Sequence, residues 1–229
     1  MLTLYYAPDN ASMVLRLALE EAALPYETIL VDRAAGAQRS AAYLSLNPTG
    51  KIPTLITPEG PLAETAACLL WISDAHPATR LGPGPRDTKR GAFLRWLFFL
   101  SNSVHADLIR VFYPHRIVPK DAIAAHHEMM AAQLDGHLRV LDDAISTEPE
   151  LFAPPSALAL YLGPMLRWAA LYPRDAERWL DLARYPAIRA LILALEARPS
   201  VKAAIAAEGL GETPFSNPSP PTPPEGSAI

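Results

Sequence analysis

The first third of the chain alternates between short β-rich runs and helical patterns. Apolar and polar positions predict, in chain order, strands at residues 2–7 and 27–31 around a helix at 12–23, strands at 52–57 and 61–63, and a helix at 65–74. Pro58-Glu59-Gly60 lies between the third and fourth strands and has the turn residues of a hairpin. A βαβ unit followed by a hairpin and a helix is typical of a mixed α/β domain, not of a doubly wound sheet. We place this domain at residues 1–77.

The pattern changes after residue 77, because glycine and proline gather in residues 78–86 and helical periodicity dominates beyond them. Apolar residues three and four apart predict one helix on Phe93, Trp96, Leu97, Leu100, Val104 and Leu108, and a second on Ile123, Met130, Leu134, Leu138, Leu141 and Ile145. Further helical segments follow between residues 156 and 208. We therefore predict a linker at 78–86 and an all-helical bundle domain at 87–212.

The last segment, residues 213–229, is rich in proline, serine and glycine. That composition excludes a helix or a central strand, so we predict a disordered tail. The alternative is a tail that docks across the active site.

Composition narrows the function classes. The 229 residues are 50% hydrophobic with a net charge of -4, which gives no field that favours nucleic acid or an anionic membrane. The single Cys68 cannot form an intrachain disulfide, and the N-terminus lacks the regions of a signal peptide. No apolar run reaches the roughly 18 residues of a membrane span. We expect a soluble, cytoplasmic protein whose partners are small molecules.

Two helix starts carry the candidate chemistry. Glu64-Thr65 stands where a strand gives way to an apolar helix, and Asn10 or Ser12 offers donors before the first helix. Free N–H groups and the Thr65 hydroxyl suit a carboxylate, while Glu64 suits an ammonium, so an α-amino acid end would satisfy both. The alternative is that these side chains only cap their helices. Pro53 either begins an edge strand or occupies a cis turn.

Motifs along nearly the whole chain before the tail resemble those of bacterial glutathione transferases. The similar segments are Tyr5-Tyr6-Ala7-Pro8, Leu19-Glu20-Glu21, Asn47-Pro48-Thr49-Gly50-Lys51-Ile52-Pro53-Thr54-Leu55, Glu64-Thr65, Arg184-Tyr185-Pro186-Ala187-Ile188 and Ala197-Arg198-Pro199-Ser200-Val201. The resemblance implies a thioredoxin-like N-terminal domain followed by a C-terminal helical bundle. It also implies glutathione as cosubstrate and a homodimer.

The resemblance assigns roles to individual glutathione contacts. It implies that Pro53 is cis and that the backbone of Ile52 pairs with the cysteinyl part of glutathione. Glu64 and Thr65 match the pair that holds the γ-glutamyl group, and Lys51 stands where a cation often lies near the glycyl carboxylate.

The catalytic position departs from the family. Beta-class bacterial enzymes have cysteine where Ala11 stands, immediately before a serine that matches Ser12. Mixed-disulfide chemistry is therefore not expected. We predict that Ser12 donates a hydrogen bond to the glutathione sulfur, with Asn10 as the second choice, the alternative being that Ser12 only caps its helix.

The family places the end of the first long helix of the second domain over the electrophile pocket. The resulting pocket candidates are His105, Arg110, Tyr113, His115 and Arg116, unless they form a solvated helix end. His126-His127-Glu128 does not predict a metal, because adjacent helix positions point in different directions. We predict a glutathione transferase that conjugates an apolar electrophile. The alternatives are a non-catalytic glutathione-transferase-like binding protein and a glutathione-dependent reductase or isomerase.

Overall fold

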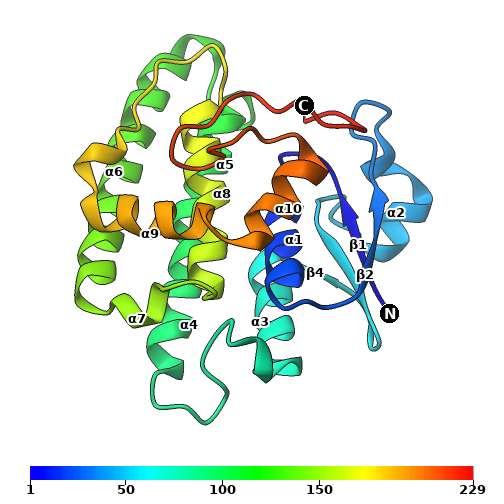
Figure 1. The fold of residues 1–229 in the computed structure, drawn as a ribbon. Helices are drawn as coiled ribbons and strands as arrows, with labels where there is room; N and C mark the ends of the chain where they lie inside the picture. The colour runs from blue at the N-terminus through cyan, green and yellow to red at the C-terminus, as the bar shows by residue number, and fades with distance from the viewer. Residues whose placement is uncertain (229) are drawn as a thin grey trace.

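The computed structural model describes residues 1–228 and begins with a four-stranded sheet of order β2-β1-β3-β4 (Figure 1). The strands are β1 (Leu2–Tyr6), β2 (Tyr26–Leu30), β3 (Thr54–Thr57) and β4 (Gly60–Ala63). β1 is parallel to β2 and antiparallel to β3, and β3 is antiparallel to β4. This order is the mixed, thioredoxin-like arrangement, so the predicted fold class of the first domain is confirmed.

Three α-helices accompany the sheet, and one of them joins it to the rest of the molecule. They are α1 (Ser12–Glu21), α2 (Ala41–Leu46) and α3 (Thr65–Ala75). α1 packs against α3 on one side and against the helical domain on the other, so Met13, Leu15 and Leu17 have no exposed surface. α2 lies at the far side of the sheet from the helical domain (Figure 1).

The first two apolar stripes form an antiparallel helix pair. The first is a continuous helix built from α4 (Arg90–Phe99), a π-helical turn η3 (Leu100–His105) and α5 (Ala106–Phe112). The second is α6 (Ile123–Thr147), on which the predicted stripe is buried except at Ile123. Both predicted helices are confirmed. The sequence did not reveal the π-helical turn, a feature that frequently occurs at functional sites.

The remaining helices complete the bundle around α8. They are α7 (Pro149–Phe152), α8 (Ala157–Leu171), α9 (Pro186–Glu196) and α10 (Pro199–Glu208). Short 3₁₀ turns are η1 (Ala37–Arg39), η2 (Pro77–Thr79), η4 (Pro114–Arg116), η5 (Lys120–Ala122) and η6 (Leu182–Arg184). α8 is almost entirely buried, and a Cβ at Gly163 would lie 2.9 Å from the Leu195 side chain. A larger residue at position 163 would therefore force the neighbouring side chains to move.

Residues 213–228 of the C-terminal tail are ordered, which contradicts the disorder predicted for this segment. It leaves α10, runs along the helical domain and returns to the N-terminal domain, as the red segment in Figure 1 shows. Phe215 is fully buried, and the backbone N–H groups of Phe215 and Ser216 donate to Glu196 at 2.8 Å. Near its end, Glu225 accepts a hydrogen bond from the hydroxyl of Tyr6. Proline excludes helix and sheet here. A segment without the regular backbone hydrogen bonds of those structures can still be fixed by a buried aromatic side chain and by hydrogen bonds from its backbone to side chains.

Candidate functional site

A cavity of about 1190 Å³ lies between the two domains. Loops of the thioredoxin-like domain form one wall, and the first long helix and α8 form the other. The predicted site residues that line it are Asn10, Lys51, Ile52, Pro53, Glu64, Thr65, His105, Arg110, Tyr113 and Arg116. Ser12 and His115 are not among the lining residues. The cavity thus brings together residues that are far apart in the sequence.

The loop before β3 lines the cavity at residues 49–53. The Ile52-Pro53 peptide bond is cis, as the family resemblance implied. The carbonyl oxygen of Lys51 accepts hydrogen bonds from Tyr43 Oη at 2.6 Å and from Asn47 Nδ2 at 2.8 Å. These two side chains come from α2 and from the residue after it, so they fix the loop at the position of Ile52.

The junction of β4 and α3 carries the acidic and hydroxyl pair. Glu64 has φ 68° and ψ 114°, a conformation that non-glycine residues rarely adopt. Thr65 is buried at the first position of α3, whereas Glu64 is exposed to the cavity and forms no ion pair within residues 1–228. Strained backbone of this kind persists where the surroundings enforce it, and it is common at ligand sites.

Ser12 does not reach the cavity. Its side chain has no exposed surface, and its Oγ donates to the carbonyl of Ala7 at 3.0 Å and accepts from the Ala7 N–H at 3.2 Å. The hydroxyl is therefore used to close the loop between β1 and α1. In this structure the Ser12 hydroxyl therefore lies outside the cavity lining, and its predicted contact with the thiol stays a prediction. Sequence reasoning could not separate a serine that faces the ligand from one that faces its own loop.

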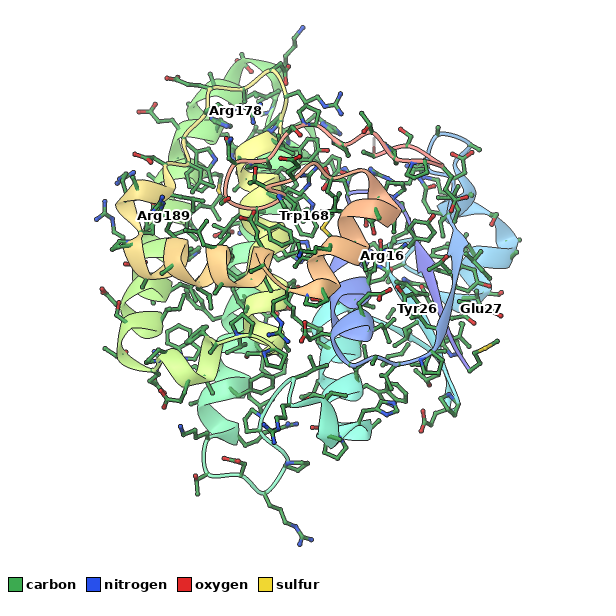
Figure 2. All side chains as sticks on the ribbon, viewed as in Figure 1. Arg16, Tyr26, Glu27, Trp168, Arg178 and Arg189 are labelled. Carbon is green, nitrogen blue, oxygen red and sulfur yellow. The ribbon has the colours of Figure 1, made fainter. Side chains whose placement is uncertain are left out.

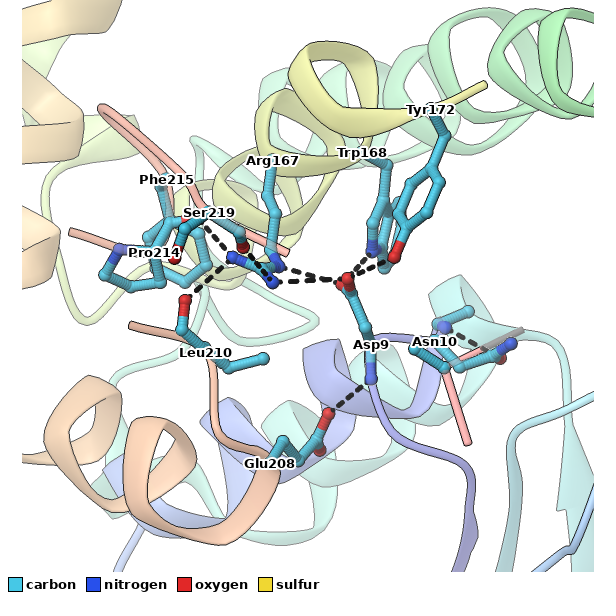
Figure 3. Close-up of polar contacts among 12 residues, drawn as sticks. Asp9, Asn10, Arg167, Trp168, Tyr172, Glu208, Leu210, Pro214, Phe215 and Ser219 are labelled. Atoms are coloured by element: carbon cyan, nitrogen blue, oxygen red, sulfur yellow. Dashed lines mark hydrogen bonds and ion pairs between the residues drawn. The ribbon is translucent and has the colours of Figure 1, made fainter. Parts of the chain in front are cut away.

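Asn10, the second choice for the contact with the thiol, lies at the cavity. It lines the cavity, and its Oδ1 accepts a hydrogen bond from the N–H of Ala11 at 2.8 Å (Figure 3). With the oxygen engaged, the amide Nδ2 is the group left to donate, and it has no partner among the described residues. The amide group therefore offers a fixed donor at the N-terminal end of α1.

Asp9 is a functional-loop residue that the sequence analysis missed. Its carboxylate accepts four hydrogen bonds from α8 and the residue after it: from Arg167 Nε at 2.9 Å, Arg167 Nη2 at 3.2 Å, Trp168 Nε1 at 3.0 Å and Tyr172 Oη at 2.7 Å (Figure 3). Its own N–H donates to Glu208 at 2.9 Å. All four lone-pair positions of the carboxylate are filled, so Asp9 positions the loop and is not a free base.

Arg167 joins the same loop to the C-terminal tail. Beyond Asp9, its guanidinium donates to the carbonyl oxygens of Leu210 at 3.0 Å, Pro214 at 3.2 Å and Ser219 at 3.0 Å (Figure 3). The Arg167 side chain has no exposed surface, and all five of its N–H donors are engaged. One buried cation therefore connects the tail, α8 and the residue before Asn10. No local motif signals this, because Asp9 and Arg167 are 158 residues apart.

His105 lies at the end of the π-helical turn, against aromatic side chains of α8. Its Nδ1 is 2.9 Å from the Tyr161 hydroxyl, and its ring centroid is 5.6 Å from that of Trp168. Burial, reinforced by the charge of Lys51, lowers the pKa of His105 to about 4. The ring is therefore neutral at pH 7 and supplies one donor and one acceptor to the cavity wall.

The depressed pKa of His105 predicts a pH-dependent stability. The folded protein resists protonation of this ring, so the stability that neutral His105 allows is lost as pH falls from about 6.5 towards 4. Over this pH window, we expect the free energy of unfolding from urea denaturation to fall by about 1–2 kcal/mol less in His105→Gln than in wild type. This difference is smaller than the full pKa shift would give, because the ring is partly exposed to the cavity. His115→Gln, at an exposed histidine, is the matched control. Identical pH profiles for wild type and His105→Gln would contradict the assignment.

The distal end of the cavity is rich in arginine. Arg110 pairs with Asp107 at 2.6 Å, Arg33 Nη2 donates to the Tyr113 hydroxyl at 3.3 Å, and the Arg116 guanidinium lies 4.0 Å from the Tyr113 ring centroid. His115 is exposed next to these residues and is not among the residues that line the cavity. Arg33 was missed because it follows β2 in the first domain, far in the sequence from the other pocket candidates.

The described residues hold neither a metal-binding cluster nor a membrane-spanning helix. Within residues 1–228, no group of three or more His, Cys, Asp or Glu side chains is arranged to hold a metal ion. None of the helices in that range is both long and apolar enough to cross a membrane.

Comparison with known proteins identifies the class that this fold and cavity define. The family model for the N-terminal domain of glutathione S-transferases matches residues 1–74. Glutathione S-transferase GST-4.5 of Xanthomonas campestris is 30% identical over 90% of this chain and 98% of its own length. The disulfide-bond oxidoreductase YfcG of Escherichia coli is 27% identical over 93% of this chain and 98% of its own. A sphingomonad glutathione S-transferase, solved in complex with glutathione, is 30% identical with a TM-score of 0.73, covering 91% of this chain and 100% of the other. The chain belongs to the glutathione S-transferase family.

Proposed function

We propose that this protein is a glutathione transferase that holds glutathione between its two domains and activates the thiol at Asn10. The observation that carries the proposal is that Asn10, Lys51, Ile52, Glu64 and Thr65 line one cavity. Glutathione bound in the sphingomonad relative supports the choice of ligand. Residues 1–77 would bind glutathione, and residues 87–212 would shape the pocket for the second substrate.

Each end of glutathione has a chemical partner in this proposal. The ammonium of the γ-glutamyl group pairs with Glu64, and its carboxylate accepts from Thr65 and the free N–H groups of α3. The cysteinyl backbone pairs with Ile52, whose loop is held by Tyr43 and Asn47. Lys51 attracts the glycyl carboxylate. Binding energy at these anchors would position the sulfur beside the loop that carries Asn10.

Activation of the thiol requires a modest stabilisation of its anion. A free cysteine thiol has a pKa of about 8.5, and lowering it by about two units takes roughly 2.7 kcal/mol. One charge-assisted hydrogen bond, here from Asn10 Nδ2, contributes about 1.5–3 kcal/mol, and the N-terminus of α1 adds to it. Because Ala11 stands where beta-class enzymes have cysteine, the nucleophile would be the sulfur of glutathione and not a protein thiol.

The relatives also define the alternatives. YfcG is named a disulfide-bond oxidoreductase, and a protein can keep a fold without its reaction. Conjugation is favoured here over protein-thiol chemistry because Cys68, the single cysteine, is buried on α3 and burial raises the pKa of its thiol to about 12. A homodimer and a cytoplasmic location complete the proposal, as the family and the lone buried thiol suggest.

Removing the charge of Glu64 tests the binding half of the proposal. We expect Glu64→Gln to weaken glutathione binding about tenfold in isothermal titration calorimetry, because the ligand ammonium loses its counter-ion. Glu59→Gln, at an exposed position in the hairpin turn outside the cavity, should bind as wild type. Equal affinities for Glu64→Gln and wild type would contradict the predicted orientation of glutathione.

Two assays on the wild-type protein separate binding from turnover. Retention on immobilised glutathione tests the first, and conjugation of glutathione to 1-chloro-2,4-dinitrobenzene tests the second. The proposal predicts both. Retention without conjugation would favour the non-catalytic alternative, and absence of both would overturn the assignment.

A further inference from the structure

The charges that line the cavity do not balance. The cationic side chains of the lining are Arg33, Arg39, Lys51, Arg110, Arg116 and Arg174, and the carboxylates are Asp9 and Glu64. Asp9 is already neutralised by Arg167, and Arg110 by Asp107. The cavity therefore keeps several unpaired cations, although the whole chain has a net charge of -4.

Two of these cations meet at one side chain. Arg33 donates to the hydroxyl of Tyr113 at 3.3 Å, and the guanidinium of Arg116 stacks on the Tyr113 ring with 4.0 Å to its centroid. No carboxylate within residues 1–228 pairs with Arg33 or Arg116. Like charges brought this close repel unless an anion lies between or beside them. We call Arg33, Tyr113 and Arg116 the arginine cluster.

Hydrogen bonds on both terminal nitrogens hold Arg33 in place in the arginine cluster. The other terminal nitrogen of Arg33, Nη1, donates to the carbonyl oxygen of Ala228 at 2.8 Å, so the guanidinium is held by both the tail and Tyr113. Ala228 is itself a lining residue. Arginine is the side chain whose planar fork matches a carboxylate, and its charge does not vanish at any physiological pH.

The floor between the arginine cluster and the Asn10 loop is aromatic and apolar. It consists of Ile109, Phe112, Trp168 and Tyr172. The rings of Phe112 and Tyr172 meet edge to face, with their centroids 6.1 Å apart. A flat apolar body would bury its faces here, while a negative group at its far end would reach the arginine cluster. A second substrate that fits this cavity therefore combines the apolar body expected from the sequence with a negative group.

We propose that the second substrate is an aromatic electrophile that carries a carboxylate, and that the arginine cluster binds this carboxylate. The inference rests on the proposed transferase function and adds the substrate class. In the reaction the thiol first loses its proton to solvent. The sulfur then forms a C–S bond at the activated ring carbon while the C–Cl bond of an aryl chloride breaks, and chloride leaves with the bonding electron pair.

A matched pair of substrates tests the proposal. 4-Chloro-3,5-dinitrobenzoate and the corresponding benzamide share ring and leaving group and differ in charge. We expect kcat/KM, divided by the uncatalysed rate with glutathione, to favour the benzoate by about tenfold or more, the ratio that one charge-assisted hydrogen bond supplies. Raising the salt concentration from 50 to 500 mM should reduce this ratio, because the arginine cluster is partly exposed.

Arginine variants locate the charge preference. Arg116→Gln lies at an exposed position where folding is not at risk, and it should bring the benzoate-to-benzamide ratio close to one, as should Arg33→Gln. Arg189→Gln on the exposed surface of α9 removes the same charge at the outer side of the helical domain, and it should keep the wild-type ratio (Figure 2). A ratio that falls equally in Arg189→Gln would mean a general field effect and would overturn the arginine cluster as the site.

An equilibrium measurement keeps this inference apart from the proposed function. The glutathione conjugates of the benzoate and of the benzamide are titrated into the wild-type protein by calorimetry, so no turnover is needed. Tighter binding of the benzoate conjugate, by about tenfold, supports the inference. Equal binding of both conjugates overturns it and leaves glutathione binding intact. Failure of both conjugates to bind overturns both proposals.

Discussion

Replacing Arg167 with methionine should lower the free energy of unfolding, measured by urea denaturation, by about 3–5 kcal/mol. This is the typical cost of removing one partner of a buried ion pair. The Asp9 carboxylate would stay buried with Trp168 and Tyr172 as its remaining side-chain donors. The carbonyl oxygens of the tail would also lose the donors that hold them. Methionine keeps much of the volume, so the effect isolates charge and hydrogen bonding.

A control and a double variant make this prediction specific. Arg189→Met, at an exposed position of α9, should change stability by less than about 0.5 kcal/mol. The double variant Asp9→Asn/Arg167→Met should lose less stability than the sum of the losses in the two single variants, because no uncompensated charge remains. Additive effects of the two substitutions would contradict a direct interaction between Asp9 and Arg167.

Asn10→Ala should slow conjugation of 1-chloro-2,4-dinitrobenzene at pH 6.5 by about 10- to 100-fold, the range that corresponds to one charge-assisted hydrogen bond. The reason is that the bound sulfur would lose the Asn10 Nδ2 donor, and a smaller fraction of the bound glutathione would be thiolate at that pH. The deficit should shrink as pH rises above the thiol pKa of the variant. A steady-state pH profile of kcat measures both effects.

Ser12→Ala is the informative comparison for Asn10→Ala. Within residues 1–228 its hydroxyl bonds only to Ala7, so its loss should cost about 1 kcal/mol of stability and shift the thiol pKa much less than Asn10→Ala does. A large rise in the thiol pKa for Ser12→Ala, with none for Asn10→Ala, would restore the serine that sequence reasoning favoured.

Periodic patterns explain how much of the fold the sequence predicts. Alternating residues give β1, and apolar steps of three and four give the helix pair that contains Val104 and Leu134, because each pattern follows from burying one face. Motif resemblance predicts glutathione contacts at Pro53, Glu64 and Thr65, and the structure brings these three residues to one cavity. In these parts of the chain, local sequence and tertiary environment agree.

The features that escaped prediction depend on long-range partners or on side-chain direction. Asp9 and Arg167 meet across 158 positions, and neither residue type in its local segment signals the other. Ser12 turns towards Ala7 by a choice of rotamer that residue identity does not determine. The tail is ordered because Arg167 and Glu196 supply its partners, whereas its composition alone indicates only that regular structure is excluded.

Burial of Asp9 and order in the tail also have a functional consequence. The tail contributes Ala228 to the cavity and holds Arg33 through it, while Arg167 ties the same tail to the residue before Asn10. The two ends of the cavity, which we propose hold the thiol and the second substrate, therefore share the C-terminal segment as a support.

The thiol pKa of bound glutathione is the most direct test of the central claim. Ultraviolet difference titration of the wild-type complex, monitored at the thiolate absorption, should give a pKa about two units below that of the free thiol. The same titration of Asn10→Ala should return most of that shift. A wild-type complex that binds glutathione but leaves its thiol pKa near the free value of about 8.5 would contradict thiol activation at Asn10.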